Sequence, residues 1–185
     1  MTEPASILID DPESRDLARA EIGMLPRGSV VLFERQIWRK PGLVKHAEWG
    51  DCYRACVASL LDLPLEEVPP FYRDAGGDAG VTRMPGVYGA IRAWARKRGL
   101  TPLFLTSTFA LPDLLAQIEE LNPGVPYILG GTSRFGTGHA VIVQHGRIIH
   151  EPTPGYGPDD GGVVAPDPSG QFEITYFAVL PSWAR

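Results

Sequence analysis

Long apolar runs, cysteines and an excess of positive charge are all scarce in this sequence. No stretch approaches the roughly 18 consecutive apolar residues that a membrane-spanning helix needs, and the first residues lack the basic and apolar regions of a secretory signal. The two cysteines, Cys52 and Cys56, are too few and too closely spaced for a secreted disulfide framework. We therefore expect a cytoplasmic protein without a membrane partner, in which each thiol has a chemical or packing role.

The charge of the chain bears on its partners, and its length bears on the number of domains. A formal net charge of −5 provides no overall attraction to nucleic acid, so we expect no nucleic-acid partner. A chain of 185 residues is long enough for one domain with a substantial core and short for two. We interpret residues 1–28 as an appended N-terminal segment and residues 29–185 as a single domain.

Hydrophobic periodicity predicts that most helices come first in the chain and that the strands of an antiparallel sheet come last. This order is typical of an α+β fold in which N-terminal helices pack on a C-terminal antiparallel sheet. The predicted helices cover residues 52–63, 86–99 and 111–121. The predicted strands cover 103–105, 126–129, 139–143, 147–150 and 172–180, and the predicted loops cover 130–138 and 152–168.

The most informative stretch is the turn Gly50-Asp51-Cys52 and the apolar helix that follows it. Pro64 ends this helix because proline has no N–H to continue the hydrogen-bond ladder. Cys52 therefore falls in the first helical turn, where unpaired backbone N–H groups and the helix dipole favour a thiolate. A thiolate at this position is a candidate nucleophile.

A nucleophilic cysteine needs a base, and the base needs a group that orients its ring. His139 is the best candidate base because it begins an apolar strand directly after a glycine-rich loop. A hairpin with its turn at Gly146 brings the end of the second strand beside the start of the first. Glu151, at that end, is therefore the candidate orienting group.

Acyl transfer also needs hydrogen-bond donors for the developing oxyanion. The Cys52 backbone N–H is one candidate donor and Gln36 is a second. Four residues flank the predicted nucleophile or base and are candidate substrate-binding residues: Trp49, Asp51, Tyr53 and Gly138. Ordinary packing explains Trp49 and Tyr53 equally well.

Several other polar residues have simpler interpretations. Cys56 lies one helical turn inside the predicted helix and is expected to pack in the core. We expect His145 in a turn and His150 at the surface. A zinc site built from Cys52, Cys56 and His139 is disfavoured because no second cysteine pair exists and the helix is apolar. The basic residues of the 86–99 helix, Arg92, Arg96, Lys97 and Arg98, are expected to form a solvated face.

Parts of the chain resemble a known family. Gly50-Asp51-Cys52, residues 63–69, residues 138–143 and residues 149–152 look like the papain-like cysteine peptidase superfamily, and more narrowly like small bacterial and phage proteins related to bacteriocin-processing peptidases. The resemblance implies a papain-like fold with Cys52 as nucleophile, His139 as base and Glu151 as orienting residue, and it implies no cofactor. The family usually has Asp where this chain has Glu151.

Together these features predict a cysteine hydrolase that cleaves a peptide or isopeptide bond in a peptide or protein substrate. An amidase or acyltransferase on the same fold is an alternative, because an amine can resolve an acyl-enzyme in place of water. A catalytically inactive binding module is another, and the unusual Glu151 is the feature that suggests it.

Overall fold

A computed structural model describes residues 51–75, 86–153, 156–159 and 162–179 of the chain. The appended segment predicted at 1–28 lies outside these residues. The helical elements are α2 (Cys52–Leu61), η1 (Leu65–Glu67, a 3-10 helix), α3 (Phe71–Asp74), α4 (Val87–Arg96) and α5 (Leu111–Leu121). The strands are β1 (Leu100–Ser107), β2 (Tyr127–Ser133), β3 (Gly138–Gln144), β4 (Arg147–His150), β5 (Val163–Ala165) and β6 (Phe172–Val179).

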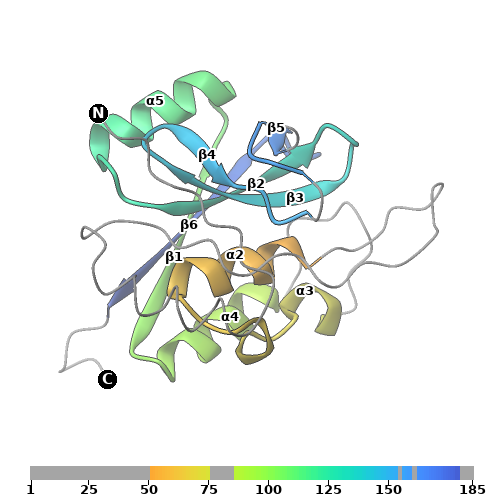
Figure 1. Cartoon of the computed structure of the whole chain (residues 1–185), viewed down its shortest axis with the longest axis vertical. Coiled ribbons are helices and arrows are strands. Elements are labelled where there is room, and N and C mark those ends of the chain that lie inside the picture. The colour runs from red at the N-terminus through yellow and green to blue at the C-terminus, as the bar shows by residue number, and fades with distance from the viewer. Residues whose placement is uncertain (1–50, 76–85, 154–155, 160–161, 180–185) are drawn as a thin grey trace.

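The strands form one antiparallel sheet with helices on both of its faces (Figure 1). Its order is β1-β6-β2-β3-β4, and β5 pairs with β2 off this path. Helices α2, α3 and α4 lie on one side of the sheet and α5 lies on the other. The α+β class with an antiparallel sheet is thus confirmed. The strand predicted at 103–105 is confirmed as part of β1, which precedes α5 as predicted. The arrangement differs from the prediction in that α5 covers the sheet face opposite to α2.

Helix α2 begins at Cys52 and ends before Pro64, as predicted. Its interior residues Ala55, Val57 and Ala58 are fully buried because α2 packs directly on β3 and β2. The helix ends at Asp62, which adopts the left-handed conformation (φ 51°) and donates its N–H to the Ala58 carbonyl. The buried central position of α2 holds its N-terminus firmly against the sheet.

Two apolar layers form the core, one on each face of the sheet. Alternate residues of β3 point to opposite layers, so that Ile142 packs with α2 whereas Val141 and Val143 pack with α5. Because both faces are covered, strand β3 is apolar at consecutive positions instead of alternating with polar residues. This double coverage explains the uninterrupted apolar run after His139.

The hairpin predicted at Gly146 is confirmed. Gln144 pairs with Arg147 across a two-residue turn, in which His145 and Gly146 both have positive φ angles (53° and 67°). His145 is exposed in this turn, as expected. The hairpin pairs His150, at the end of β4, with Ile142 of β3. Glu151 follows β4 and reaches His139 near the start of β3.

The two predicted loops are wrong in part. Residues 130–133 belong to β2, and residues 163–165 form the short strand β5. Gly131 explains both differences, because a Cβ atom there would lie 2.6 Å from the Ala165 carbonyl oxygen and 2.6 Å from a Val163 methyl group. The glycine that indicates a loop in sequence is instead needed for the close approach of β5.

This contact predicts that Gly131→Ala destabilises the fold. The added methyl group overpacks against the β5 backbone, and we expect a loss of about 1–3 kcal/mol of unfolding free energy. Gly89→Ala in α4 is the matched control, since nothing lies within 4 Å of a Cβ there and helical Ala is more stable than Gly by up to about 1 kcal/mol. Urea unfolding of both variants tests the prediction, and equal stabilities would contradict it.

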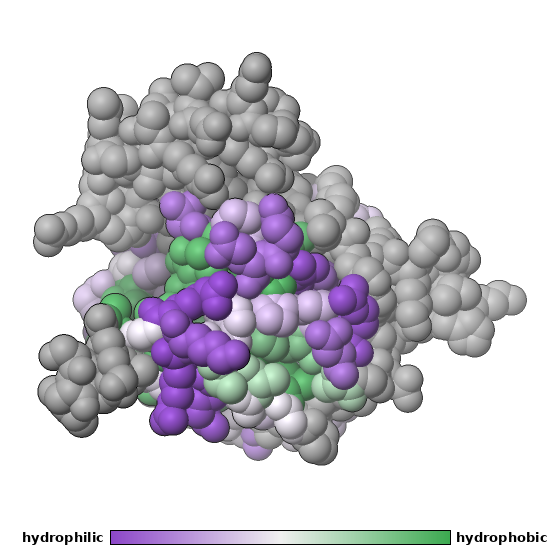
Figure 2. All heavy atoms as spheres, turned by 90° about the horizontal axis from the view of Figure 1, so that it is seen from below, coloured by the Kyte–Doolittle hydropathy of each residue, from purple (hydrophilic) through white to green (hydrophobic). Residues whose placement is uncertain are grey.

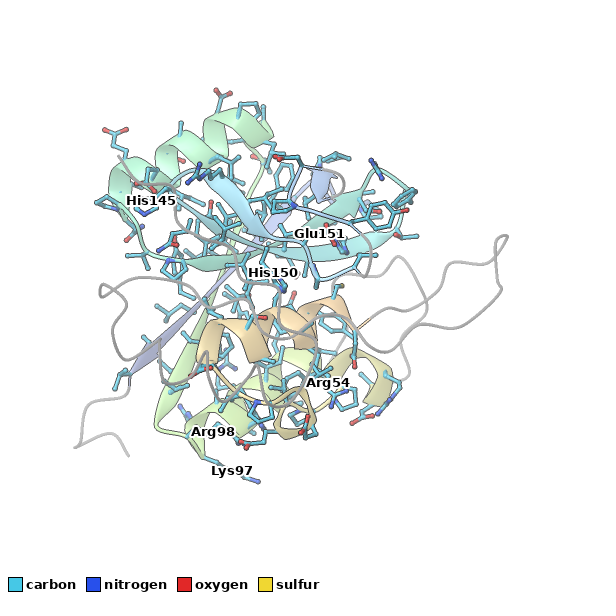
Figure 3. All side chains as sticks on the ribbon, in the orientation of Figure 1. Arg54, Lys97, Arg98, His145, His150 and Glu151 are labelled. Atoms are coloured by element: carbon cyan, nitrogen blue, oxygen red, sulfur yellow. The ribbon has the colours of Figure 1, made fainter. Side chains whose placement is uncertain are left out.

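The basic residues of the predicted 86–99 helix are exposed, and Arg98 among them contacts other residues of the protein. Lys97 and Arg98 lie at the lower edge of the molecule (Figure 3). Seen from below, this side of the molecule carries several groups of hydrophilic residues (Figure 2). The Arg98 guanidinium lies 4.4 Å from the centre of the Trp94 ring and 3.6 Å from a Glu67 carboxylate oxygen. These contacts fit a solvated face that packs on its own helix.

Candidate active site

Cys52 is the first residue of α2, with Asp51 at the N-cap position. Its side chain is partly buried, and its thiol is not in a disulfide. The first N–H groups of a helix have no acceptor within the helix, so the Cys52 backbone N–H can serve a ligand. This position combines a free thiol, a backbone donor and the positive end of the helix dipole.

His139 is hydrogen-bonded to Glu151, and it lies close enough to the Cys52 side chain for Cys52 to raise the pKa of the imidazole. Its Nε2 lies 2.9 Å and 3.0 Å from the two carboxylate oxygens of Glu151. Because Glu151 occupies Nε2, Nδ1 is the ring nitrogen left to exchange a proton with the thiol. The structure therefore brings the three sequence-predicted residues together in the order thiol, imidazole, carboxylate.

Glu151 is held in place by its surroundings. Only 2 % of its surface is exposed, and its carboxylate accepts backbone N–H bonds from Thr153 (2.8 Å) and Gly162 (2.6 Å). It follows directly after β4 and lies at the level of the sheet in Figure 3. These bonds fix the carboxylate in a single orientation toward His139.

The pKa values of the pair favour an ion pair between His139 and Glu151. Burial lowers the pKa of His139, but hydrogen bonds to Cys52 and Glu151 outweigh it and raise that pKa to about 10. Burial raises the pKa of Glu151, but the hydrogen bond and charge of His139 outweigh it, and the net shift is downward. The site thus stabilises an imidazolium between a carboxylate and a thiol.

These shifts predict how the pair contributes to stability across pH. The pKa of His139 is raised, so its contribution is complete below the ordinary value of 6.5 and is lost as the pH rises toward about 10. The pKa of Glu151 is lowered, so its contribution is present above the ordinary value of 4.5 and is lost as the pH falls. We expect the stability difference between wild type and His139→Gln to be largest between about pH 4.5 and 6.5 and to shrink at higher pH. Urea unfolding at pH 5.5, 7.5 and 9.5 measures it, and a constant difference would contradict the ion pair.

The other candidate site residues have mixed outcomes. Asp51 is buried and pairs with Arg54 (Oδ2 to Nη1, 2.8 Å), an arrangement that holds the turn before Cys52. Tyr53 is 8 % exposed and donates its hydroxyl to Thr175 Oγ1 at 3.5 Å, which fits the packing interpretation. Gly138 begins β3 and pairs with Thr132. Gln36 and Trp49 lie outside the described residues.

Cys56 and His150 are buried between α2 and the sheet. The Cys56 thiol is fully buried and contacts the Ala140 carbonyl oxygen at 3.5 Å, and burial raises its pKa well above the ordinary value. The prediction that Cys56 packs in the core is confirmed. The prediction of a surface His150 is wrong, because this side chain is 3 % exposed and its Nε2 lies 3.3 Å from Ser59 Oγ. Its strand position beside Ile142 turns it toward α2, where Ser59 provides a polar partner.

The backbone donors of Glu151 were not predicted. Gly162 has a positive φ of 88° and donates to the carboxylate from within the predicted loop after β4. Glycine in a glycine-rich loop is a weak signal, since it is compatible with many loop conformations. The position of this donor depends on β5, which the sequence did not reveal.

In the part of the chain that the structure describes, no three or more His, Cys, Asp or Glu side chains are grouped to hold a metal ion. Among the same residues, no helix has both the length and the apolar character needed to cross a bilayer. Comparison with known protein families, with curated proteins and with solved structures finds no match for the chain.

Proposed function

We propose that this protein is a cysteine hydrolase of papain-like fold that cleaves a peptide or isopeptide bond. The observation that carries the proposal is the grouping of Cys52, His139 and Glu151, in which Cys52 acts on the pKa of His139 and Glu151 is hydrogen-bonded to the imidazole at 2.9 Å. These residues come from α2, from β3 and from the segment after β4, and each is placed by its own secondary structure. A thiol, an imidazole and a carboxylate in this order are the groups that nucleophilic catalysis requires.

In the first half-reaction, the Cys52 sulfur attacks the carbonyl carbon of the substrate and the thiol proton is held on His139. The resulting tetrahedral oxyanion accepts a hydrogen bond from the Cys52 backbone N–H, with Gln36 proposed as a second donor. The C–N bond then breaks as His139 gives its proton to the leaving amine. An acyl-enzyme thioester on Cys52 and a free amine are the products.

In the second half-reaction, water attacks the thioester carbonyl while His139 removes a proton from it. The C–S bond breaks, the carboxylic acid product leaves, and the proton returns to the Cys52 sulfur. Throughout the cycle Glu151 holds the imidazole ring and stabilises its charged form. Two backbone N–H groups keep the carboxylate oriented for this role.

The length of the Glu151 side chain bears on the inactive alternative. Glutamate in place of the usual aspartate suggested a binding module without activity, yet the longer side chain lies within hydrogen-bond distance of His139. The observed contact therefore favours catalysis over binding alone. We further propose a cytoplasmic location, since the free thiols of Cys52 and Cys56 suit a reducing compartment.

Capture of the acyl-enzyme tests the proposal. The protein is incubated with a library of peptide thioesters, quenched in acid and digested, and the mass of the Cys52 peptide is measured. We expect an added acyl group on Cys52 that disappears with time in water. Acylation of neither cysteine, or of Cys56 in place of Cys52, would contradict the proposal. Amide products formed in the presence of added amines would identify an acyltransferase.

A further inference from the structure

A cavity of about 360 Å³ opens between α4 and the strand pair β1–β6. Its walls include Phe104 and Leu105 from β1, and its polar groups include Glu173 and Thr175 from β6. Tyr88, near the start of α4, also lines it. The proposed chemistry at Cys52 makes no use of this cavity.

Glu173 provides the negative charge of the cavity. Its side chain is half-buried, and its carboxylate accepts a hydrogen bond from the Tyr88 hydroxyl. Gly130 lies directly opposite on β2, where a Cβ atom would be only 3.3 Å from the Cβ of Glu173. Gly130 thus leaves room for the Glu173 side chain on the sheet face that α2 and α4 cover.

Strand register places Glu173 close to the candidate catalytic residues. Glu173 pairs with Gly130, which pairs with Ala140, the neighbour of His139. Adjacent strands are about 4.8 Å apart, so the Glu173 backbone is about 10 Å from β3. An extended peptide advances about 3.3 Å per residue. A substrate side chain two or three residues from the scissile bond could therefore reach the cavity.

The α2 helix provides a second link between the cavity and the site. Tyr53 follows Cys52 directly, and its hydroxyl meets Thr175, a cavity residue, at 3.5 Å. The Tyr53 ring packs against Tyr72 with ring centres 5.5 Å apart. Burial raises the pKa values of Tyr53 and Tyr72, and the negative charge of Glu173 raises both further. The carboxylate of Glu173 therefore lies close enough to both tyrosines to act on them.

Arg92 is the opposing charge at the cavity. Its side chain is exposed to solvent, and its guanidinium lies 5.8 Å from the centre of the Phe104 ring. Water and salt screen an exposed charge more strongly than a half-buried one. Among the described residues that line the cavity, Glu173 and Arg92 are the charged ones, and the half-buried carboxylate of Glu173 is the less screened of the two.

We propose that this cavity receives a lysine or arginine side chain of the substrate, two or three residues from the scissile bond. The inference rests on the proposed hydrolase function. The aliphatic stem of such a side chain packs on Phe104, and its charged end is attracted to Glu173. Glu173 is thus the specificity-determining residue, while Cys52 and His139 carry out the chemistry.

Cleavage of matched peptides tests the proposal. A positional peptide library is cleaved first, and lysine is then compared with norleucine, its uncharged isostere, at each position flanking the cut. For the wild type we expect kcat/KM to be at least about tenfold higher for lysine at one position two or three residues from the bond. Glu173→Gln should bring this ratio close to one by lowering kcat/KM for the lysine peptide more than for the norleucine peptide.

Two control variants separate charge from packing. Arg92→Gln removes the opposing charge and should keep or increase the lysine preference. Tyr88→Phe removes the hydroxyl that bonds to Glu173 but keeps the carboxylate, so the preference should persist. A wild-type ratio near one at every position, or an unchanged ratio in Glu173→Gln, would overturn the proposal.

Binding by the Cys52→Ala variant distinguishes this proposal from the proposed function. Calorimetry with the lysine and norleucine peptides measures recognition without cleavage. If the wild type cleaves no peptide while Cys52→Ala binds lysine peptides in a Glu173-dependent way, the hydrolase proposal fails and the cavity assignment stands. If peptides are cleaved and bound with no preference for lysine, the cavity assignment fails and the hydrolase proposal stands.

Discussion

Cys52→Ala and His139→Ala are each expected to lower the rate of peptide cleavage about a thousandfold or more. The first variant removes the attacking sulfur, and the second removes the group that accepts and returns its proton. Because both residues act in one unit, the double variant should be no slower than either single variant. Initial rates on a cleavable peptide, measured for all three variants and the wild type, test this expectation.

The structure provides a close control for these variants. Cys56 is one turn further along α2, is fully buried and contacts the Ala140 carbonyl instead of His139. Cys56→Ala removes the same atoms from the same helix, so it should lose some stability and keep its activity. Circular dichroism should show a folded protein for every variant. Activity in Cys52→Ala equal to that of wild type would rule out the proposed nucleophile.

Glu151→Gln is expected to lower the cleavage rate by about a hundredfold to ten-thousandfold. The amide keeps nearly the same shape but loses the charge that stabilises the imidazolium, and it can present its NH₂ group to His139 Nε2. The pKa of His139, measured by NMR titration, should fall from its raised value. An unchanged His139 titration would show that the carboxylate does not support the ring.

Stability measurements separate two roles of Glu151: accepting backbone hydrogen bonds and orienting His139. Glu151→Ala leaves the Thr153 and Gly162 N–H groups without their acceptor, and each unsatisfied buried group costs about 1–3 kcal/mol. Glu151→Gln keeps one acceptor oxygen and should lose less. Glu151→Asp shortens the reach to His139, and we expect it to be less active than wild type even though aspartate is usual in the resembled family.

Local signals were sufficient to predict much of the fold. Helix α2 depended on its apolar spacing and on Pro64, and the β3–β4 hairpin depended on a turn at Gly146. The errors involve long-range contacts. Strand β5 is three residues long and exists because it pairs with β2 beside Gly131. A glycine that permits close packing between strands has the same sequence appearance as a glycine in a loop.

In the candidate site, too, local signals predicted some residues, whereas others depend on long-range contacts. Cys52, His139 and Glu151 each lie at the end of a locally predictable element, so their convergence followed from one helix and one hairpin. Glu173 did not stand out, because its nearness to β3 depends on β6 entering the sheet beside β2. The buried position of His150 likewise depends on which sheet face α2 covers.

Alkylation by iodoacetamide between pH 5 and 9, followed by peptide mass spectrometry, tests the central claim most directly. A thiol paired with an imidazolium should react well below the range of an ordinary thiol, whose pKa is about 8.5. We predict rapid modification of Cys52 near pH 6 in the wild type, loss of this low-pH reaction in His139→Ala, and no modification of buried Cys56 in either protein. If Cys52 reacts with the same pH dependence in both proteins, His139 does not activate the thiol and the proposed mechanism is wrong.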